Sequence, residues 1–479
     1  MSSIDVHRQH YNVTFTLLAV AAISYALLQS LVAPALLTIQ HDLHTTTAGA
    51  AWILSAYLLS ASVMTPIVGR LGDMFGKKRM LVAVLVVLAA GTALAGLATS
   101  ITVMIVARVI QGAGGAIFPL AFAIIRDEFP PERVPHGIAL ISAILGIGGG
   151  LGIVLAGPIV QHLSYHWLFW LPLIVVVASA IGTMVFVPES PVRTPGRIDP
   201  IGAALLSGWL VALLVPVSEG ESWGWTSGKT VGLFGVAAVL IVVWVWAESR
   251  SKAPVVDMRM MRLRGVWTTN LAALVFGFGM YASFVLVPQF VELPKATGFG
   301  FGASVTKAGL FMVPATVGML LAGPVSGRLS TTVGSKVPLL IGALVSAVAF
   351  VILASAHSAD WEIYTAMLIM GVGIGFAFAS MANLIVEAVP GHQTGVATGM
   401  NTIVRTIGGA IGSQVAAGIV TATVAGNGLP SETGFTIAFA ASAAALSIGF
   451  VVALAVPARA GARKIAAFRQ LEVGEWQRR

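Results

Sequence analysis

Two arginines lie inside long stretches of sequence that contain no other charged residue. Arg108 is the only charge between residues 80 and 125, and Arg405 is the only one between residues 388 and 431. Stretches of this length can cross a bilayer, where a charged side chain costs roughly 2.5–3.5 kcal/mol and normally faces a cavity or a partner. We therefore predict that each arginine faces a cavity. The alternative is an arginine held by backbone carbonyls, or one whose guanidinium reaches the membrane interface.

A second cluster of chemistry-bearing residues lies in segment 69–79, which places one acid among four bases. Its glycines allow helix ends to approach closely. Asp73 can pair with Arg70 or Arg79, or can cap the N-terminus of a neighbouring helix. The other possibility is an ordinary basic turn on the cytoplasmic side of a membrane. The candidate residues are Gly69, Arg70, Asp73, Gly76, Lys77, Lys78 and Arg79.

The uncharged stretches offer no buried carboxylate that could carry protons. As their limits are drawn from the sequence, none contains Asp or Glu. Glu292 and Glu387, at the ends of two stretches, are candidates for proton coupling together with Asp73. Either glutamate can equally be an interfacial charge.

Other polar or amphipathic residues lie inside or beside the uncharged stretches and could line a cavity. Tyrosine and tryptophan at the ends of membrane spans can instead anchor the helix at the interface. With Arg405, the candidates are Tyr25, Gln29, Trp52, Tyr57, Tyr281, Gln289, Asn383 and Asn401.

The composition identifies the elements that must position these residues. Of the 479 residues, 57% are hydrophobic and only 10% are charged, whereas soluble domains carry roughly 25% charged residues. A soluble enzyme and a nucleic-acid-binding protein are therefore excluded, and we predict an all-α polytopic membrane protein that is not an enzyme. The chain has no cysteine, and we predict no metal site.

The uncharged stretches predict fourteen membrane spans. A polar break at residues 161–166 divides the longest stretch, and the two stretches on either side of Arg405 join into one helix. With the N-terminus inside, the inner segments hold 22 basic residues and the outer segments hold 3. Because Lys and Arg concentrate in cytoplasmic loops, this bias predicts that both termini are cytoplasmic.

Two halves of the chain repeat each other. Residues 69–78 resemble residues 327–336, and Gly148 and Gly152 correspond to Gly408 and Gly412 at nearly the same offset. Small residues four apart allow close helix packing, the role we assign to these glycines. Repeated halves are typical of secondary transporters, whose site lies between them. The predicted organisation is a six-helix bundle at 1–190, a central insertion with two helices at 191–264, a second six-helix bundle at 265–457 and a basic cytoplasmic tail at 458–479.

These motifs resemble those of the major facilitator superfamily. Segment 69–79 is similar to the signature between its second and third helices, and residues 107–115 are similar to its helix-four motif, with Arg108, Gln111 and Gly112. Residues 198–202 and 223–225 resemble the fourteen-span drug:proton antiporter branch. The resemblance implies the major facilitator fold and a cytoplasmic latch at segment 69–79. It departs from the branch at Leu28, where we would align an acid.

The function expected from the sequence is export of small amphipathic molecules, driven by the proton gradient. The alternatives are an uptake symporter of the same fold and a receptor or scaffold that does not transport. Residues 224–230 resemble a phosphate-binding loop but have three residues, not four, between the glycines, so we expect no ATP and no other cofactor. The expected partners are the substrate, protons and the lipid bilayer, with no nucleic acid. We expect a monomer in the bacterial cell membrane. The two arginines favour neutral, zwitterionic or anionic substrates over dications.

Overall fold

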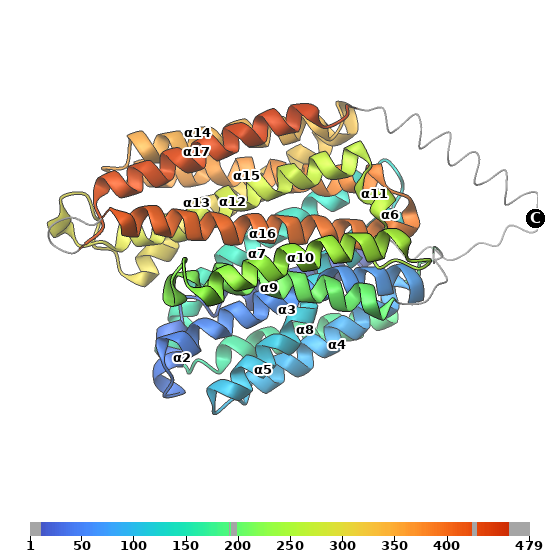
Figure 1. Cartoon of the computed structure of the whole chain (residues 1–479), viewed down its shortest axis with the longest axis horizontal. Coiled ribbons are helices and arrows are strands. Elements are labelled where there is room, and N and C mark those ends of the chain that lie inside the picture. The colour runs from blue at the N-terminus through green and yellow to red at the C-terminus, as the bar shows by residue number, and fades with distance from the viewer. Residues whose placement is uncertain (1–10, 191, 193–198, 424–428, 459–479) are drawn as a thin grey trace, which may run out of the picture.

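The computed structural model describes residues 11–190, 192, 199–423 and 429–458, which form a bundle of long helices (Figure 1). Fourteen helical segments among them are long and apolar enough to cross a bilayer, which confirms the predicted number of spans. The helices of the first half are α1 (Tyr11–Ser30), α2 (Leu36–Asp42), α3 (Thr47–Phe75), α4 (Lys77–Gly96), α5 (Ile101–Gln111), α6 (Ile117–Glu128), α7 (Val134–His162) and α8 (Trp167–Phe186).

The remaining helices follow in the same pattern after the central insertion. A 3₁₀ turn at Gly112–Ala116 joins α5 to α6, so these two helices form one span. The later helices are α9 (Pro200–Trp223), α10 (Gly228–Arg250), α11 (Met258–Met261), α12 (Arg264–Glu292), α13 (Val305–Thr332), α14 (Lys336–Ser355), α15 (Asp360–Ala388), α16 (Thr394–Ala422) and α17 (Glu432–Ala455).

The helices extend beyond the uncharged stretches, and this corrects one prediction. The expectation that no span contains an acid is wrong. Asp73 lies in α3, Glu219 in α9 and Glu248 in α10, and all three side chains are buried. A helix continues while its backbone hydrogen bonds and its packing permit, so it does not end at the first charge. The Glu248 carboxylate accepts a hydrogen bond from Trp244 Nε1 at 3.2 Å.

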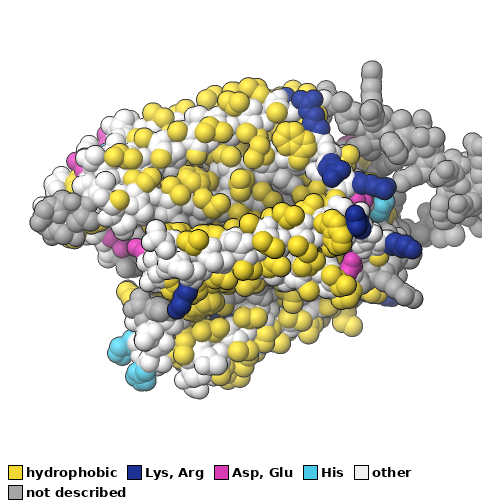
Figure 2. All heavy atoms as spheres, in the orientation of Figure 1, with side chains coloured by type: hydrophobic (Ala, Val, Ile, Leu, Met, Phe, Trp, Pro, Cys, Tyr) yellow, Lys and Arg dark blue, Asp and Glu magenta, His cyan; other side chains and the backbone are white. Residues whose placement is uncertain are grey.

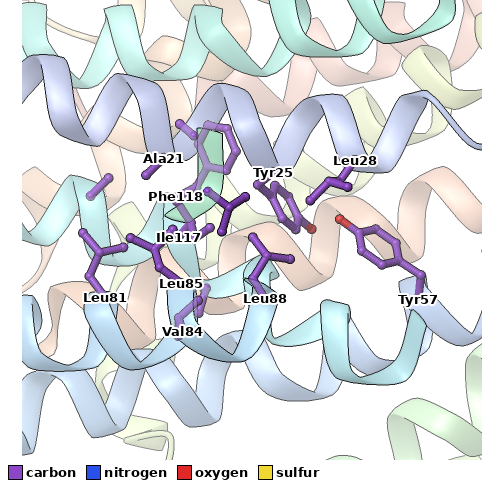
Figure 3. Close-up of a cluster of buried hydrophobic side chains, with 14 of the residues drawn as sticks. Ala21, Tyr25, Leu28, Tyr57, Leu81, Val84, Leu85, Leu88, Ile117 and Phe118 are labelled. Carbon is purple, nitrogen blue, oxygen red and sulfur yellow. The ribbon is translucent and has the colours of Figure 1, made fainter. Parts of the chain in front are cut away.

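Two hydrophobic cores divide the molecule. The first core is formed by the helices from α1 through α8, and Figure 3 shows the part of it between α1, α4 and α6. The second core is formed by the helices from α12 through α17. A third core, with Trp209 and Trp244, seats the central pair α9 and α10 against α12, α15 and α16. In Figure 1 the central pair lies across the boundary between the halves.

The two halves meet chiefly along two pairs of helices, α3 with α16 and α7 with α13, and α15 also contacts α7 while α16 contacts α6. At the first contact Gly69 lies directly against the backbone of Gly395, where any side chain would collide with the opposite helix. At the second, Gly327 of α13 lies against His136 of α7. These contacts bring the ends of the four helices together at one end of the molecule.

Charged side chains are distributed unevenly over the surface. Figure 2 shows Lys and Arg gathered at the end of the molecule that carries α11, while hydrophobic side chains cover the middle. A hydrophobic belt of this kind is the surface that a lipid bilayer surrounds. Segment 69–79 lies at this same end, and we call it the latch end.

Candidate functional site

A cavity of about 410 Å³ lies between the two halves. Its volume falls in the range of roughly 300–1,000 Å³ that is usual for small-molecule sites. The first half contributes side chains from α1, α3, α5, α6 and α7, and the second half from α12, α13, α15 and α16. No Asp or Glu is among its lining residues. The cavity can therefore hold an amphipathic molecule of drug size without offering it a carboxylate.

Two tyrosines form the wall on the side of the first half. Tyr25 of α1 and Tyr57 of α3 stack with ring centroids 5.9 Å apart, and their hydroxyl groups point toward each other (Figure 3). Arg108 lies over the Tyr57 ring, with its guanidinium carbon 4.1 Å from the ring centroid. This contact places a cation on an aromatic face, which is favourable in a desolvated site.

The hydrogen bonds of Arg108 are mostly used within the protein. Its Nε donates to the Ile53 carbonyl at 3.1 Å, and its Nη1 donates to the Leu28 carbonyl at 3.4 Å. Nη1 also donates to Gln111 Oε1 at 2.7 Å, and Gln111 in turn donates to Thr92 Oγ1 at 3.1 Å. Only Nη2 has no partner within the described residues. Arg108 thus faces the cavity and is also held by carbonyls, so both interpretations offered by the sequence are partly realised.

Arg405 has different surroundings on the opposite wall. Its guanidinium carbon lies 4.4 Å from the centroid of the Phe378 ring, and within the described part of the chain the guanidinium makes no hydrogen bond or ion pair. Its backbone is fixed because Gly277 of α12 lies directly against its carbonyl group. Arg405 also lines a smaller cavity of about 20 Å³, together with Asn401. It therefore presents an unpaired cation to the space between the halves.

The remainder of the wall in the second half is rich in methionine. Methionine side chains are flexible and polarizable, so they adapt to ligands of different shapes. The sequence gives no signal for them, because a methionine facing a cavity and one in a core have the same helical spacing. The lining methionines are Met280, Met312, Met319, Met367 and Met370.

The structure separates the predicted cavity residues into two groups. Those on the wall of the large cavity are Tyr25, Gln29, Tyr57, Tyr281 and Arg405. Trp52, Gln289 and Asn383 lie elsewhere, and Asn383 donates to the Pro135 carbonyl at 3.2 Å. Asn401 lines only the small cavity and donates to Asn270 Oδ1 at 2.9 Å. A polar residue in an apolar helix can serve helix packing as well as a site, which explains the group outside.

Asp73 joins the two halves at the latch end. Its side chain is fully buried, and its oxygens accept hydrogen bonds from the backbone N–H groups of Gly395 at 3.3 Å and Val396 at 3.2 Å. These residues are in the first turn of α16, whose free N–H groups and helix dipole favour a negative charge. Of the alternatives left open by the sequence, Asp73 therefore caps a helix, and this helix belongs to the other half.

Among the basic residues of segment 69–79, Lys77 contacts both halves, and Lys78 and Arg79 bond within their own half. Lys77 is buried and forms an ion pair with Asp127 of its own half, and its Nζ lies 3.4 Å from the Gly391 carbonyl of the other half. The backbone N–H groups of Lys78 and Arg79 donate to Glu189 at 3.2 and 3.3 Å. These bonds cap the start of α4. The Nε atom of Arg70 is buried without a partner within the described residues.

Gly76 and Arg126 are two further residues at the latch end that make close contacts. Gly76 has φ +114°, a conformation that favours glycine, and it lies against the Glu189 carboxylate. The sequence reasoning missed Arg126, which donates to Thr394 Oγ1 at 2.7 Å and to the Val389 carbonyl at 2.8 Å. Its position in a predicted basic loop gave no indication of a contact between the halves.

The two glutamates proposed for proton coupling lie away from the cavity. Glu292 is exposed at the last residue of α12. Glu387 accepts a hydrogen bond from Ser335 Oγ at 2.7 Å near the end of α15. Ser335–Glu387 is the counterpart in the second half of Lys77–Asp127 in the first, with offsets of 258 and 260 residues. The repeat therefore preserves the contact but removes the ion pair.

The glycines of the two helix-packing motifs lie at equivalent contacts. Gly148 and Gly152 of α7 pack on α1, where Ser30 Oγ donates to the Gly148 carbonyl at 2.9 Å. Gly408 and Gly412 of α16 pack on the backbone of α12. Gly112 lies against Ser60 of α3. Among the described residues, no group of three or more His, Cys, Asp or Glu is arranged to hold a metal ion.

Comparisons with known proteins agree with this architecture. Residues 18–413 match the model of the Major Facilitator Superfamily. The chain is 28% identical over 333 residues to Multidrug resistance protein 3 of Bacillus subtilis (strain 168), covering 69% of this chain and 64% of that protein's length. It is 28% identical over 388 residues to the Tetracenomycin C resistance and export protein of Streptomyces glaucescens, covering 80% and 71% of the two chains.

A solved structure shows the same fold at low sequence identity. The human organic anion transporter MFSD10 (TETRAN) superimposes with a TM-score of 0.66 at 17% identity, and the match covers 94% of this chain and 99% of that one. At this identity the similarity concerns the arrangement of the helices.

Proposed function

The chain belongs to the Major Facilitator Superfamily, and on this basis we propose that it exports small amphipathic compounds by alternating access, driven by the proton gradient. It is a multi-pass membrane transporter and not an enzyme. The observation that carries the proposal is a large amphipathic cavity between two halves that are joined at the latch end by Asp73. The relatives named for multidrug resistance and export support the direction.

We place the latch end in the cytoplasm of a bacterial cell whose plasma membrane contains the protein. The Lys and Arg side chains gathered at this end support that orientation, because cytoplasmic loops are enriched in them (Figure 2). With the latch closed, the cavity faces away from the cytoplasm or is occluded. Export then requires the latch to break, so that substrate can enter from the cytoplasm.

We propose that Asp73 is the group that couples protons to this movement. An ionised carboxylate accepts both N–H groups of α16, whereas a protonated one loses the charge that makes these bonds strong. Protonation of Asp73 would therefore weaken the contact between the halves. Glu292 and Glu387 have no comparable contact, since one is exposed and the other bonds within its own half.

The function is tested by measuring accumulation of a fluorescent amphiphile in cells with and without the protein. We expect lower accumulation in cells that express it, and we expect an uncoupler to abolish the difference. Equal accumulation in the two cell populations, at confirmed expression in the membrane, would contradict export.

The coupling group is tested in proteoliposomes by recording proton movement after substrate is added. Asp73→Asn should abolish substrate-driven proton movement, and Glu292→Gln and Glu387→Gln should retain it, because of these three acids Asp73 is the one that bonds to the other half within the described residues. Normal proton movement by Asp73→Asn would show that another group carries the proton.

A further inference from the structure

We propose that the central cavity binds amphipathic monoanions, with the acidic group of the ligand at Arg405. This inference rests on the proposed function and specifies the substrate class of the same cavity. It begins from the difference between the two arginines on the cavity wall.

Arg405 is the arginine that is free to bind a ligand. Arg108 already donates to Ile53, Leu28 and Gln111. Arg405 contacts the Phe378 ring, which leaves the edge of its guanidinium and all its N–H groups without a protein acceptor in the described part of the chain. A guanidinium offers five N–H donors in a planar fork that matches a carboxylate.

The cavity provides no negative charge that could neutralise Arg405. Its lining contains no Asp or Glu. Asp73, an acid that does lie between the halves, is at the latch end, where it is bound to α16. Because the attraction between charges is stronger where water is scarce, an unpaired cation in this cavity favours an anionic ligand over a neutral one and disfavours a cationic one.

The remaining wall fits the apolar part of such a ligand. Met312 and Met319 of α13 and Met367 and Met370 of α15 line the cavity, and Phe284 of α12 adds an aromatic surface. On the same wall as Arg405, Tyr281 packs against Gly409, one helical turn along α16. The ligand therefore has a polar end near α16 and an apolar end against α13 and α15.

The probe for this site is 11-(dansylamino)undecanoic acid, compared with its primary amide, which has the same shape without the charge. Binding of each is measured by dansyl fluorescence to the purified full chain in phosphatidylcholine nanodiscs at pH 7.4, with empty nanodiscs subtracted. We expect the acid to bind at least about tenfold more tightly than the amide, as one charge-assisted interaction implies. Equal affinities in the unmodified protein would overturn the proposal.

The location is tested by three variants. Arg405→Gln should reduce the preference for the acid to about twofold or less, and Arg405→Lys should retain part of it because the charge remains. The matched control is Arg250→Gln, which removes an exposed arginine that also stacks on an aromatic ring, at 4.6 Å from the Trp246 centroid, outside the cavity. A preference that persists in Arg405→Gln, or that is lost equally in Arg250→Gln, would contradict the assignment to Arg405.

The source of the anion is distinguished by adding phosphatidylglycerol to the nanodiscs. Unchanged binding of the acid supports a free amphiphile as the ligand, whereas displacement of the acid would assign Arg405 to a lipid head group and overturn the proposal. The binding measurement uses no proton gradient. Failure of the acid to bind therefore contradicts this inference, and failure of gradient-driven export contradicts only the proposed function.

Discussion

At the scale of single residues, Asp73 makes the most direct connection between the two halves. It is a buried carboxylate whose oxygens bind the first turn of a helix from the opposite half. Ionised, it gains from the N–H groups and from the dipole of α16. Any movement that separates α3 from α16 must break these bonds, so Asp73 contributes directly to the stability of the latched state.

We predict that Asp73→Asn leaves the protein inserted and folded but lowers the export rate at least about tenfold. The amide has a similar shape, but it brings no charge, and charge-assisted hydrogen bonds are roughly twice as strong as neutral ones. The measurement is the initial rate of amphiphile export from cells at matched expression.

The control for this variant is Asp199→Asn, which removes an acid that caps its own helix. Asp199 accepts from the N–H groups of Ile201 at 3.0 Å and Gly202 at 3.1 Å. A hydrogen bond from Ser251 and that from Gly202 hold the pKa of Asp199 below its usual range. Its stabilising effect is therefore complete above the unfolded pKa of about 3.9 and is lost only as the pH falls through the lower folded value.

Asp199 stays ionised between pH 5 and 8, so it cannot contribute to a pH dependence of export in that range. We expect Asp199→Asn to export at nearly the unmodified rate. If Asp73→Asn exports at the rate of the unmodified protein, or if both variants lose the same share of that rate, Asp73 does not act as a latch between the halves.

The sequence could identify these residues but not their partners. Arg108 and Arg405 look alike in the sequence, since each is a single charge in an apolar stretch. They differ because Ile53 and Leu28, on two other helices, bring carbonyl groups to Arg108. Such contacts depend on how helices pack, which the spacing of residues along one helix does not contain.

At the scale of helices, the close contact of α16 with α12 positions the second half of the cavity. Gly277 and Gly408 let the two backbones touch, and Gly277 lies against the carbonyl of Arg405. Small residues permit this approach, and van der Waals contact then holds the pair together in the absence of water. The orientation of Arg405 toward the cavity follows from this contact.

We predict that Gly408→Ala destabilises the protein by about 1–3 kcal/mol, the usual cost of overpacking. The added methyl group would collide with the backbone carbonyl of Leu274. Gly418→Ala, on the same helix, is the matched control, because no atom lies within 4 Å of the position its methyl group would take. Thermal unfolding in detergent measures both. Equal melting temperatures for the two variants would show that the contact of α16 with α12 is looser than described.

The number of helices and their breaks were predictable from the sequence, whereas their ends were not. The predicted break at residues 161–166 covers the last two residues of α7 and the connection to α8, and α16 runs uninterrupted through Arg405, as predicted. The predicted ends of the spans were wrong at Glu219 and Glu248. The uncharged stretches exclude these two residues, but both lie within helices and are buried. An acid can enter a helix when it finds a partner, as Glu248 finds Trp244 one turn earlier in α10. Where the helix then ends depends on its packing, which the uncharged stretches do not contain.

At the scale of the whole molecule, two halves enclose a shared cavity, and the proposed function requires them to move about it. The repeat at an offset near 260 residues predicted the pairing of halves, and the structure adds the two seams, α3 with α16 and α7 with α13. In this structure hydrogen bonds of Asp73, Lys77, Arg126 and Asn383 join the halves at the latch end. Alternating access requires these contacts to break while the opposite end closes.

The chain contains no cysteine, so spin labels can be introduced at chosen positions without background. Glu132 and Thr331 are exposed at the latch end, one in each half, and Leu163 and Ser304 are exposed at the opposite end. Double electron–electron resonance on Glu132→Cys/Thr331→Cys and on Leu163→Cys/Ser304→Cys reports the two ends separately. We predict that lowering the pH, or adding Asp73→Asn, lengthens the first distance and shortens the second, because either change weakens the contact of Asp73 with α16. Two distances that stay unchanged under both conditions would contradict it.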